Sequence, residues 1–477
     1  MPNSSPPQGT VILFCAAAAT ALVLFPLLMP THDFDRGIFV SVAERLLAGD
    51  RLYAGVWDNK GPFFYYLVAC QRLAGGAGEI LAEVLLVALS SYSVFRLVMA
   101  FSCIRNALLA GFIAAPIILT GVYYFPGYTH LPAIALSFAS LALIAMKQPV
   151  WSGFVLGLTL FTNILVAPVA FCSVLALYWG RAKANWIVRL GLGVVLSVLL
   201  VTALLSTRGE LRPFLNAVIA NFAYSQGSLV KGHGLVAPLL SHLSLINFDR
   251  AKIIAAAICA CLLYAHLNSG QARGVLLRAA ITSFCASAAV LATTGLWRQH
   301  LQILSIPAIL SVSAVLASDM KSRTGPRLAI TILLSWILSG GGAPSRYAEA
   351  AARFGDRWKA LNAVPQDTRA MVVGSRPSTY ARLGKNDDFG HAIGLAGWKL
   401  GCARFHQYPF DTNENLKNAL DCAAGVETIL VTPSFAPKQD QPDWNRFVAA
   451  GEKLLSSGFH CERRGIFRVC RRRSPGA

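Results

Sequence analysis

Apolar runs dominate the first 340 residues, and they constrain the fold more than any other feature of the chain. An α-helix needs about 20 consecutive apolar residues to cross the hydrocarbon core of a bilayer. Of all residues, 55% are hydrophobic and only 14% are charged, whereas soluble domains are about 25% charged. The sequence therefore predicts an all-α polytopic bundle of membrane-spanning helices.

We expect about eleven spans in this bundle. Their approximate ranges are 10–30, 79–101, 107–125, 129–147, 150–162, 164–180, 186–206, 252–268, 275–296, 300–318 and 327–340. The ranges 150–162 and 327–340 are short for a span. A further apolar run at 62–76, PFFYYLVACQRLAGG, is too short to cross and is expected to lie in the interface or dip into it.

Lysine and arginine set the expected orientation, because they gather in cytoplasmic loops. With the N-terminus in the cytoplasm, the short inner connections hold Arg96, Arg105, Lys147, Arg181, Lys183, Arg189, Arg273, Arg278, Lys321, Arg323 and Arg327. Against this, residues 1–10 carry no Lys or Arg, while Arg36 follows the first span. The sum over the chain predicts a multi-pass membrane protein with a cytoplasmic N-terminus, which we expect in the bacterial plasma (inner) membrane. The same bias accounts for the net charge of +19, so we expect no nucleic-acid partner.

Three sizeable parts then face the outer, periplasmic side. A membrane domain at 1–340 carries the extracytoplasmic loops 31–78 and 207–251, and a soluble domain follows at 341–477. In that soluble domain, 370–374 and 427–432 are strand candidates, whereas 413–424 and 443–457 have helical periodicity. The segments FHCER and IFRVCRR read as a closing hairpin. These elements predict a small α/β domain.

Cysteine usage agrees with this placement. Seven of the eleven cysteines lie in apolar segments, and the other four, all in the soluble domain, are Cys402, Cys422, Cys461 and Cys470. An even set in one domain is typical of an oxidising compartment. Four cysteines allow three connectivities. Of these we expect Cys461 to pair with Cys470 across the hairpin, and Cys402 with Cys422.

Acidic residues gather at one place in this apolar chain. Only 10 of the 23 Asp and Glu residues lie in the first 340 positions, and the first outer loop holds five of those 10: Asp33, Asp35, Glu44, Asp50 and Asp58. The last two aspartates differ in context. Asp50 fits a turn after a helix from Ile38 to Leu47, and Asp58 stands just before Lys60. Glu44 lies on that helix, with Arg45 or Arg51 as its expected partner.

Two groups of residues in this loop indicate a catalytic or substrate-binding role. Asp33 and Asp35 stand where the first span leaves the bilayer, where a charge is costly. Asp58 and Lys60 precede the next apolar helix. A lysine can bind a phosphate as a point charge, and an aspartate can take a proton from an acceptor nucleophile. Together they predict a site for a lipid-linked phosphate substrate.

The same residues resemble a known family. The pattern D-x-G from Asp35, A-x-x-L-L-x-G from Ala43, L-Y at 52–53 and W-D-x-K-G-P from Trp57 is similar to the C-superfamily (GT-C) membrane glycosyltransferases. Within them it resembles the dolichyl-phosphate-mannose protein mannosyltransferase-like group and the bacterial lipid A aminoarabinose transferases. The sharp motif covers 35–78, and the overall plan covers the whole chain.

This resemblance implies roles for individual residues. It implies that Asp35 is the catalytic aspartate, that Asp58 is a second catalytic carboxylate with Asp33 beside the substrate, and that Lys60 contacts the lipid phosphate. Where the family tends to carry an acidic residue in the next outer loop, this chain has His130 in FPGYTHLP. The late motif LWRQHLQILSIPAIL places Arg298 and His300 near the phosphate.

The family implies no firm cofactor here. One aspartate cluster and a distant histidine make a poor cage for a hard divalent metal, so a metal is left open but not supported. The implied partners are a polyprenyl-phosphate sugar donor, membrane lipid, and an extracytoplasmic lipid, polysaccharide or protein acceptor. Lys231 and His233 lie in the second large loop, which could order over the site as a lid.

Two other function classes stay open. One is a transporter or flippase for a lipid-linked substrate, although transporters usually carry ionisable residues at mid-bilayer and internal repeats. The other is a non-catalytic envelope scaffold, which leaves the acidic loop unexplained.

Overall fold

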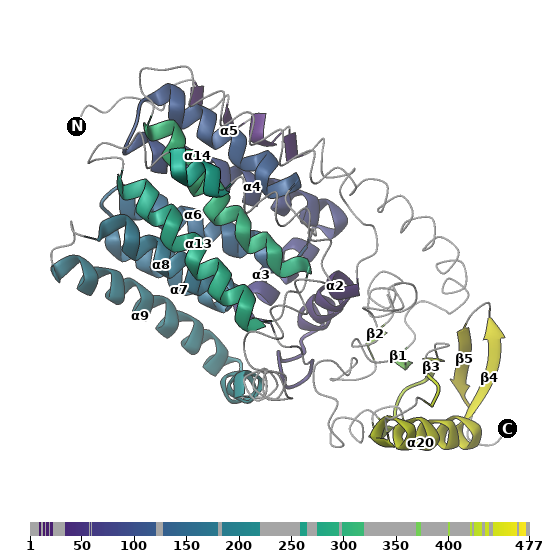
Figure 1. Cartoon of the computed structure of the whole chain (residues 1–477). Helices are drawn as coiled ribbons and strands as arrows, with labels where there is room; N and C mark the ends of the chain where they lie inside the picture. Colours follow the sequence, from purple (N-terminus) through teal and green to yellow (C-terminus); the bar gives the residue numbers. More distant parts are fainter. Residues whose placement is uncertain are drawn as a thin grey trace.

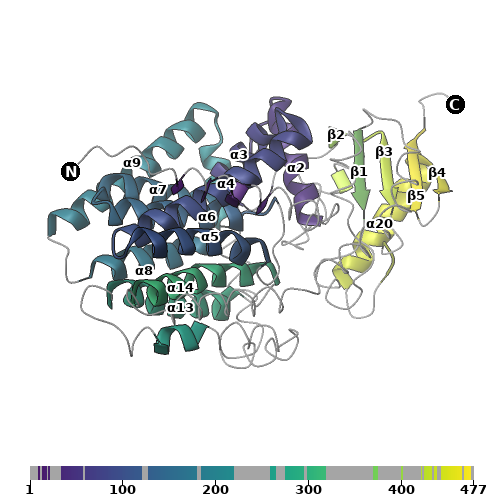
Figure 2. The same cartoon turned by 90° about the horizontal axis from the view of Figure 1, so that it is seen from above.

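The computed structural model has two parts, a helical bundle and a smaller domain built on a sheet (Figure 1). The structure describes residues 9–21 with gaps, 34–120 except 57 and 59, 127–179, 184–219, 258–264, 274–294 and 298–318. In the smaller domain it describes 369–373, 399–400, 420–421, 424–431, 435–437, 442–464 and 467–473. In both views α2 (Phe34–Leu47) lies between the bundle and the sheet (Figures 1 and 2).

Helices follow one another through the membrane part. They are α3 (Pro62–Arg72), α4 (Gly75–Met99), α5 (Ile104–Thr120), α6 (His130–Ala145), α7 (Pro149–Thr162), α8 (Val166–Tyr178), α9 (Ala184–Thr207), α13 (Gly274–Thr294) and α14 (Ser305–Ser318), with a 3₁₀ helix η1 (Arg298–Leu304) leading into α14. Eight of the expected spans coincide with these helices. The span expected at 327–340 lies outside the described residues, and those at 10–30 and 252–268 are described only in part.

Four of the described helices are long and apolar enough to cross a membrane: Ala77–Met99, Asn185–Thr207, Gly274–Leu291 and His300–Ala317. Shorter apolar helices accompany them at Ile104–Leu119, His130–Ala145, Pro149–Thr162 and Val166–Tyr178. The helical membrane fold agrees with the sequence, and the number of eleven spans stays a prediction.

Small residues bring α7 and α9 into backbone contact. A Cβ atom added at Gly193 of α9 would lie 1.9 Å from the carbonyl oxygen of Val150, and one at Gly153 of α7 would lie 2.0 Å from that of Leu190. Packing of this kind is common where lipid leaves no hydrophobic gain for helix association. The other side of α9 is apolar and exposed, as expected of a surface that faces lipid: Ile187, Val188, Leu192, Val195, Leu196, Leu199 and Leu200.

The C-terminal domain carries a mixed five-stranded sheet in the order β2-β1-β3-β5-β4. Its strands are β1 (Arg369–Val373), β2 (Lys399–Leu400), β3 (Thr428–Val431), β4 (Phe459–Arg464) and β5 (Phe467–Arg472). β1 is parallel to β2 and β3, whereas β5 runs antiparallel to β3 and β4. The helix α20 (Pro442–Gly458) covers the sheet with Phe447, Val448 and Leu455.

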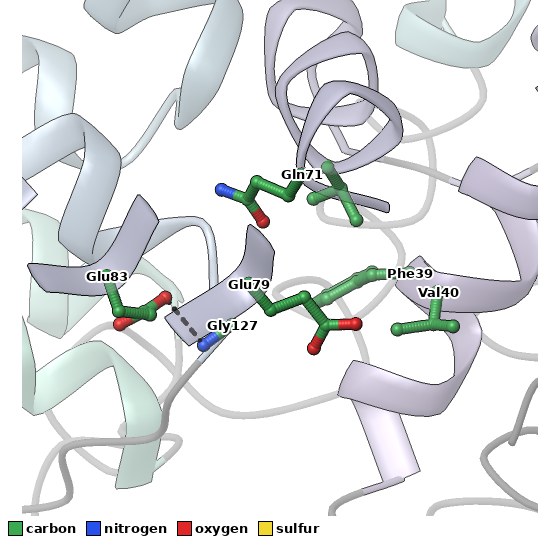
Figure 3. A pocket seen from close by; sticks show the side chains of 7 residues that line it. Phe39, Val40, Gln71, Glu79, Glu83 and Gly127 are labelled. Atoms are coloured by element: carbon green, nitrogen blue, oxygen red, sulfur yellow. Dashed lines mark hydrogen bonds between the residues drawn. The ribbon is translucent and has the colours of Figure 1, made fainter. Parts of the chain in front are cut away.

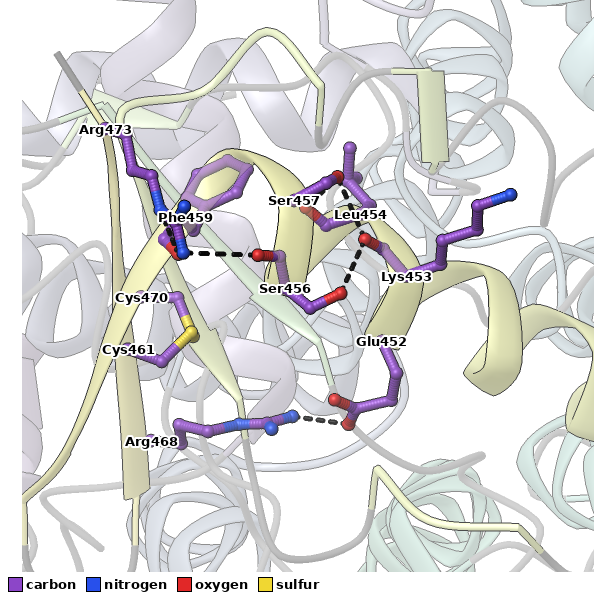
Figure 4. The surroundings of a disulfide bond; sticks show 10 residues. All are labelled: Glu452, Lys453, Leu454, Ser456, Ser457, Phe459, Cys461, Arg468, Cys470 and Arg473. Atoms are coloured by element: carbon purple, nitrogen blue, oxygen red, sulfur yellow. Dashed lines mark hydrogen bonds and ion pairs between the residues drawn. A yellow bond between two sulfur atoms is a disulfide. The ribbon is translucent and has the colours of Figure 1, made fainter. Parts of the chain in front are cut away.

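Most of the expected elements of this domain are confirmed. The strands at 370–374 and 427–432, the helix at 443–457 and the hairpin are all present, whereas β2 was not expected. Of the helix expected at 413–424, the structure describes only residues 420–421 as helical. The Cys461–Cys470 disulfide joins directly paired residues of β4 and β5 (Figure 4). Cys402 and Cys422 lie outside the described residues.

Two neighbouring glycines of α9 test the packing. Gly193→Ala should destabilise the protein by about 1–3 kcal/mol, because the methyl group overpacks against α7. Gly191→Ala is the matched control, since a Cβ there meets nothing within 4 Å, and the change should gain up to about 1 kcal/mol of helix propensity. Unfolding temperatures in detergent measure both. Equal temperatures for the two variants would contradict backbone contact between α7 and α9.

Candidate functional site

The first outer loop is organised around aromatic contacts of α2. The Phe39 ring lies 4.9 Å from the Phe64 ring of α3, 6.2 Å from Tyr65 and 5.7 Å from Tyr128, centroid to centroid. The expected helix from Ile38 is corrected, since α2 begins at Phe34. Asp35 therefore stands in the first turn of a helix, where the macrodipole favours a negative charge. It lies one turn before Phe39.

A strained turn holds Lys60 in place. Tyr53 has φ 65°, a left-handed conformation that is uncommon for a bulky residue. Its hydroxyl donates to the backbone carbonyl of Lys60 at 2.6 Å. Burial, and then the negative charge of Asp58, raise the pKa of Tyr53 well above its usual value. The hydroxyl thus keeps its proton and stays a donor.

Gly61 fixes the same segment against the bundle. A Cβ atom at this position would lie 1.9 Å from the carbonyl oxygen of Phe161, near the end of α7. Pro62 then begins α3 at a position where its missing N–H costs nothing. Asp58 is 3% exposed, and the Tyr65 hydroxyl of α3 donates to its carboxylate. The expected short interfacial helix is present, although it ends at Arg72 rather than at 76.

Three of the expected site residues meet at this end of the bundle. The rings of His130 and His300 lie 5.8 Å apart between centroids. Gly61, next to Lys60, packs against the backbone of Phe161 at the end of α7. Asn163 donates from its amide to the Thr129 hydroxyl at 2.8 Å, which fixes the start of α6. Segments distant in the sequence thus converge: the first loop, the start of α6 and η1.

Glu210 joins the loop at 31–78 to the start of the loop at 207–251, and sequence reasoning missed it. Its carboxylate is fully buried. It accepts a hydrogen bond from the Leu52 amide at 3.0 Å and another from the Tyr66 hydroxyl, and Arg208 pairs with it at 3.0 Å. Burial and the hydrogen bond to Glu210 raise the pKa of Tyr66, which stays a donor. The available signal was rarity, because only three acidic residues lie between positions 84 and 340.

A second ion-pair group holds α2 to its neighbours. Arg72 of α3 donates to Glu44 of α2 and to Glu79 of α4, both at 2.7 Å. The expected pairing of Glu44 with Arg45 or Arg51 is therefore wrong, because Arg72 lies across the α2–α3 contact. Arg45 instead pairs with Asp50, in the turn that the sequence predicted.

A pocket lies beside this ion-pair group, between α2, α3 and α4 (Figure 3). The Glu83 carboxylate accepts from the Gly127 amide at 3.0 Å. Apolar side chains and Gln71 line the rest: Phe39, Val40 and Val68. Since each carboxylate here is tied to a neighbouring element, we assign both Glu79 and Glu83 to holding α4 against the loops.

Several expected residues fall outside this description. Asp33, Lys231 and His233 lie outside the described residues. For Asp35 and Arg298 the structure describes the backbone, Arg298 being the first residue of η1, and not the side chain. Within the described part of the chain, no group of three or more His, Cys, Asp or Glu side chains is placed to hold a metal ion.

The Glu210 contacts can be tested by truncation. Glu210→Ala leaves the Leu52 amide and the Tyr66 hydroxyl without their acceptor, which should cost about 1–3 kcal/mol for each group that stays buried. Glu452→Ala is the matched control, because the Glu452–Arg468 pair is exposed and should contribute about 0–1 kcal/mol. Thermal unfolding of the two variants gives the comparison. A loss for Glu210→Ala no greater than for the control would contradict a buried anchor.

Comparison of the sequence with known proteins finds no match. No family model matches the chain, and no curated protein matches it. Solved structures do. The ArnT structure from Cupriavidus metallidurans bound to undecaprenyl phosphate has a TM-score of 0.55 at 14% identity, over 98% of each chain.

Two further structures match with lower scores. They are the archaeal oligosaccharyltransferase AglB from Archaeoglobus fulgidus with an inhibitory peptide and a dolichol-phosphate (TM-score 0.45, 13% identity, 98% of this chain and 75% of that one) and the mycobacterial arabinofuranosyltransferase AftD (TM-score 0.47, 13% identity, 97% and 40%). We take the fold from the ArnT structure alone. The structural neighbours of this chain are GT-C glycosyltransferases, and its fold is similar to that of the ArnT structure.

Proposed function

We propose that this chain is a glycosyltransferase that moves a sugar from a polyprenyl-phosphate donor to an acceptor on the outer side of the bacterial plasma membrane. One observation carries the proposal: Lys60, His130 and His300 converge at one end of an apolar bundle with a GT-C fold. A polyprenyl chain would lie in the bilayer, with its phosphate at the interface where this group stands.

In this proposal the cations act on the leaving group. The acceptor oxygen attacks the anomeric carbon, the bond from that carbon to the phosphate oxygen breaks, and the lipid phosphate leaves with an additional negative charge. Lys60, with Arg298 as its partner, stabilises that developing charge, which favours the transition state over the ground state. The Tyr53 and Gly61 contacts described above keep the lysine backbone fixed, so little reorganisation is needed.

The aspartates act on the acceptor. Asp35 takes the proton of the acceptor nucleophile as a general base or orients it, and Asp33 lies beside the substrate. Asp58 is the second catalytic carboxylate, oriented by the Tyr65 hydroxyl. Asp35 stands at the start of α2, a helix that packs against α3 through Phe39 and Phe64, and this packing supports a positioning role.

The partners follow from this assignment. They are the lipid-linked donor, membrane lipid, and a lipid, polysaccharide or protein acceptor selected by the outer loops and the C-terminal domain. The sugar is a hexose or a pentose. Transfer of radiolabelled sugar from a polyprenyl-phosphate donor to envelope material tests the reaction. A flippase or a scaffold would leave the label on the lipid.

Lys60→Met tests the phosphate contact. The change keeps the apolar stem and removes the charge, so we expect donor affinity and turnover each to fall about tenfold or more, or about 1.4 kcal/mol each. A lysine that only anchors α3 at the interface would survive the change. Lys453→Met is the matched control, since Lys453 is exposed on α20 of the outer domain. Unchanged donor affinity and turnover in Lys60→Met would contradict the assignment of Lys60 to the lipid phosphate.

Asp35→Asn tests the base. The substitution keeps the size of the side chain and removes its charge, and transfer should fall about a hundredfold or more. Membrane insertion and donor binding should stay normal, as measured by fractionation and by lipid binding. Near-normal transfer by the Asn variant would move the role to Asp33 or Asp58.

A further inference from the structure

His130 stands out among the buried polar groups of the described residues. It is 3% exposed, and neither ring nitrogen has a hydrogen-bond partner within the part of the chain that the structure describes. A buried polar group that stays unpaired costs about 1–3 kcal/mol. Native structures keep such groups where a water or a ligand completes the bonds.

The surroundings of the His130 ring indicate which class of ligand would complete its hydrogen bonds. His300 approaches from η1 at 5.8 Å between centroids, and Gly61, next to Lys60, packs against Phe161, two residues before Asn163. The backbone that carries His130 is held still, because Asn163 binds Thr129 at 2.8 Å. The fold therefore brings the ring and the segment that carries Lys60, to which we assign the lipid phosphate, to the same end of the bundle.

The chemistry of the ring favours hydroxyl groups over phosphate. A positive imidazolium beside an ammonium in a buried site is disfavoured, so the neutral ring fits this place. A neutral imidazole offers one donor and one acceptor. A hydroxyl group matches both, whereas a phosphate offers acceptors only. The sugar is bonded directly to the phosphate, so sugar hydroxyls are the groups that would reach a ring beside Lys60.

We infer that His130, with His300 beside it, forms the subsite that binds hydroxyl groups of the donor sugar. This inference rests on the proposed function, and it assigns sugar recognition to the two histidines and lipid-phosphate binding to Lys60. The two parts of the donor are then bound by different residues, and the two contributions to affinity can be separated.

The experiment compares two kinds of probe on the purified full-length chain in lipid nanodiscs. One is bare undecaprenyl phosphate. The other is a panel of undecaprenyl phosphates carrying a hexose, a pentose or an aminopentose. The wild-type protein should bind at least one sugar-bearing lipid more tightly than the bare lipid. His130→Phe should reduce that advantage about tenfold and leave the affinity for the bare lipid unchanged.

Two variants control the result. His130→Asn keeps a donor and an acceptor and should retain part of the advantage, whereas His460→Phe, at an exposed position of β4 in the outer domain, should change nothing. His130→Phe should also unfold at a temperature no lower than the wild type, because a phenyl ring leaves no unpaired polar atom. A marked fall in that temperature would mean that native contacts already satisfy the ring, and would overturn the inference.

The remaining outcomes are also decisive. A full sugar advantage in His130→Phe, or none for any sugar in the wild type, overturns the sugar subsite. So does a transition metal bound at one equivalent and lost in His130→Phe, since the ring would then be a metal ligand. Failure of the proposed function would give a different result, which concerns the bare lipid. In that case bare undecaprenyl phosphate does not bind, or its binding does not respond to Lys60→Met.

Discussion

A charged side chain inside hydrocarbon carries a high free-energy cost, and the arrangement of the rest of the structure depends on this constraint. The helices α4 to α9, α13 and α14 are mainly apolar along the parts that are expected to cross the membrane. The candidate site residues therefore lie at one end of the bundle. There the chain must still satisfy each buried polar group that it brings out of water. In the loop at 31–78, Gly61 contacts α7 and the Tyr53 hydroxyl is bonded to the Lys60 backbone.

One buried charge group, around Glu210, and one partly exposed group, around Arg72, give those loops a defined shape. Glu210 connects the base of the second loop to Leu52 and Tyr66, and Arg72 connects α2, α3 and α4. Truncating one partner of such a group leaves the others in a low-dielectric site without a partner, which is costly. The loops therefore hold their arrangement before any substrate arrives. In a site that stabilises a developing charge, such prior order is what makes the stabilisation effective.

The sequence predicted the parts of this fold that depend on local pattern. Apolar runs located eight helices, and the alternation around Arg464 and Gly465 predicted the hairpin and the Cys461–Cys470 pair. The motif around Asp58 and Lys60 predicted a substrate site in the loop at 31–78, and that site stays a prediction.

What the sequence left open depends on contacts between distant segments. The partner of Glu44 is Arg72, 28 positions away, and Glu210 meets Leu52 across 158 positions. Neither distance has a local signature. The left-handed φ of Tyr53 has no local signature either, because bulky residues rarely adopt it. The helix α2 also begins earlier than expected, at Phe34, so Asp35 is helical rather than part of a loop.

The backbone strain at Tyr53 has a consequence for adaptation of the protein. A side chain held at φ 65° costs about 1–3 kcal/mol, and glycine or asparagine would relieve it. A search for heat-resistant variants should therefore favour those residues at position 53, at the expense of the hydroxyl that holds Lys60. Under the proposed function, stability and activity are opposed at this one residue, so variants selected for thermal resistance alone should lose activity there.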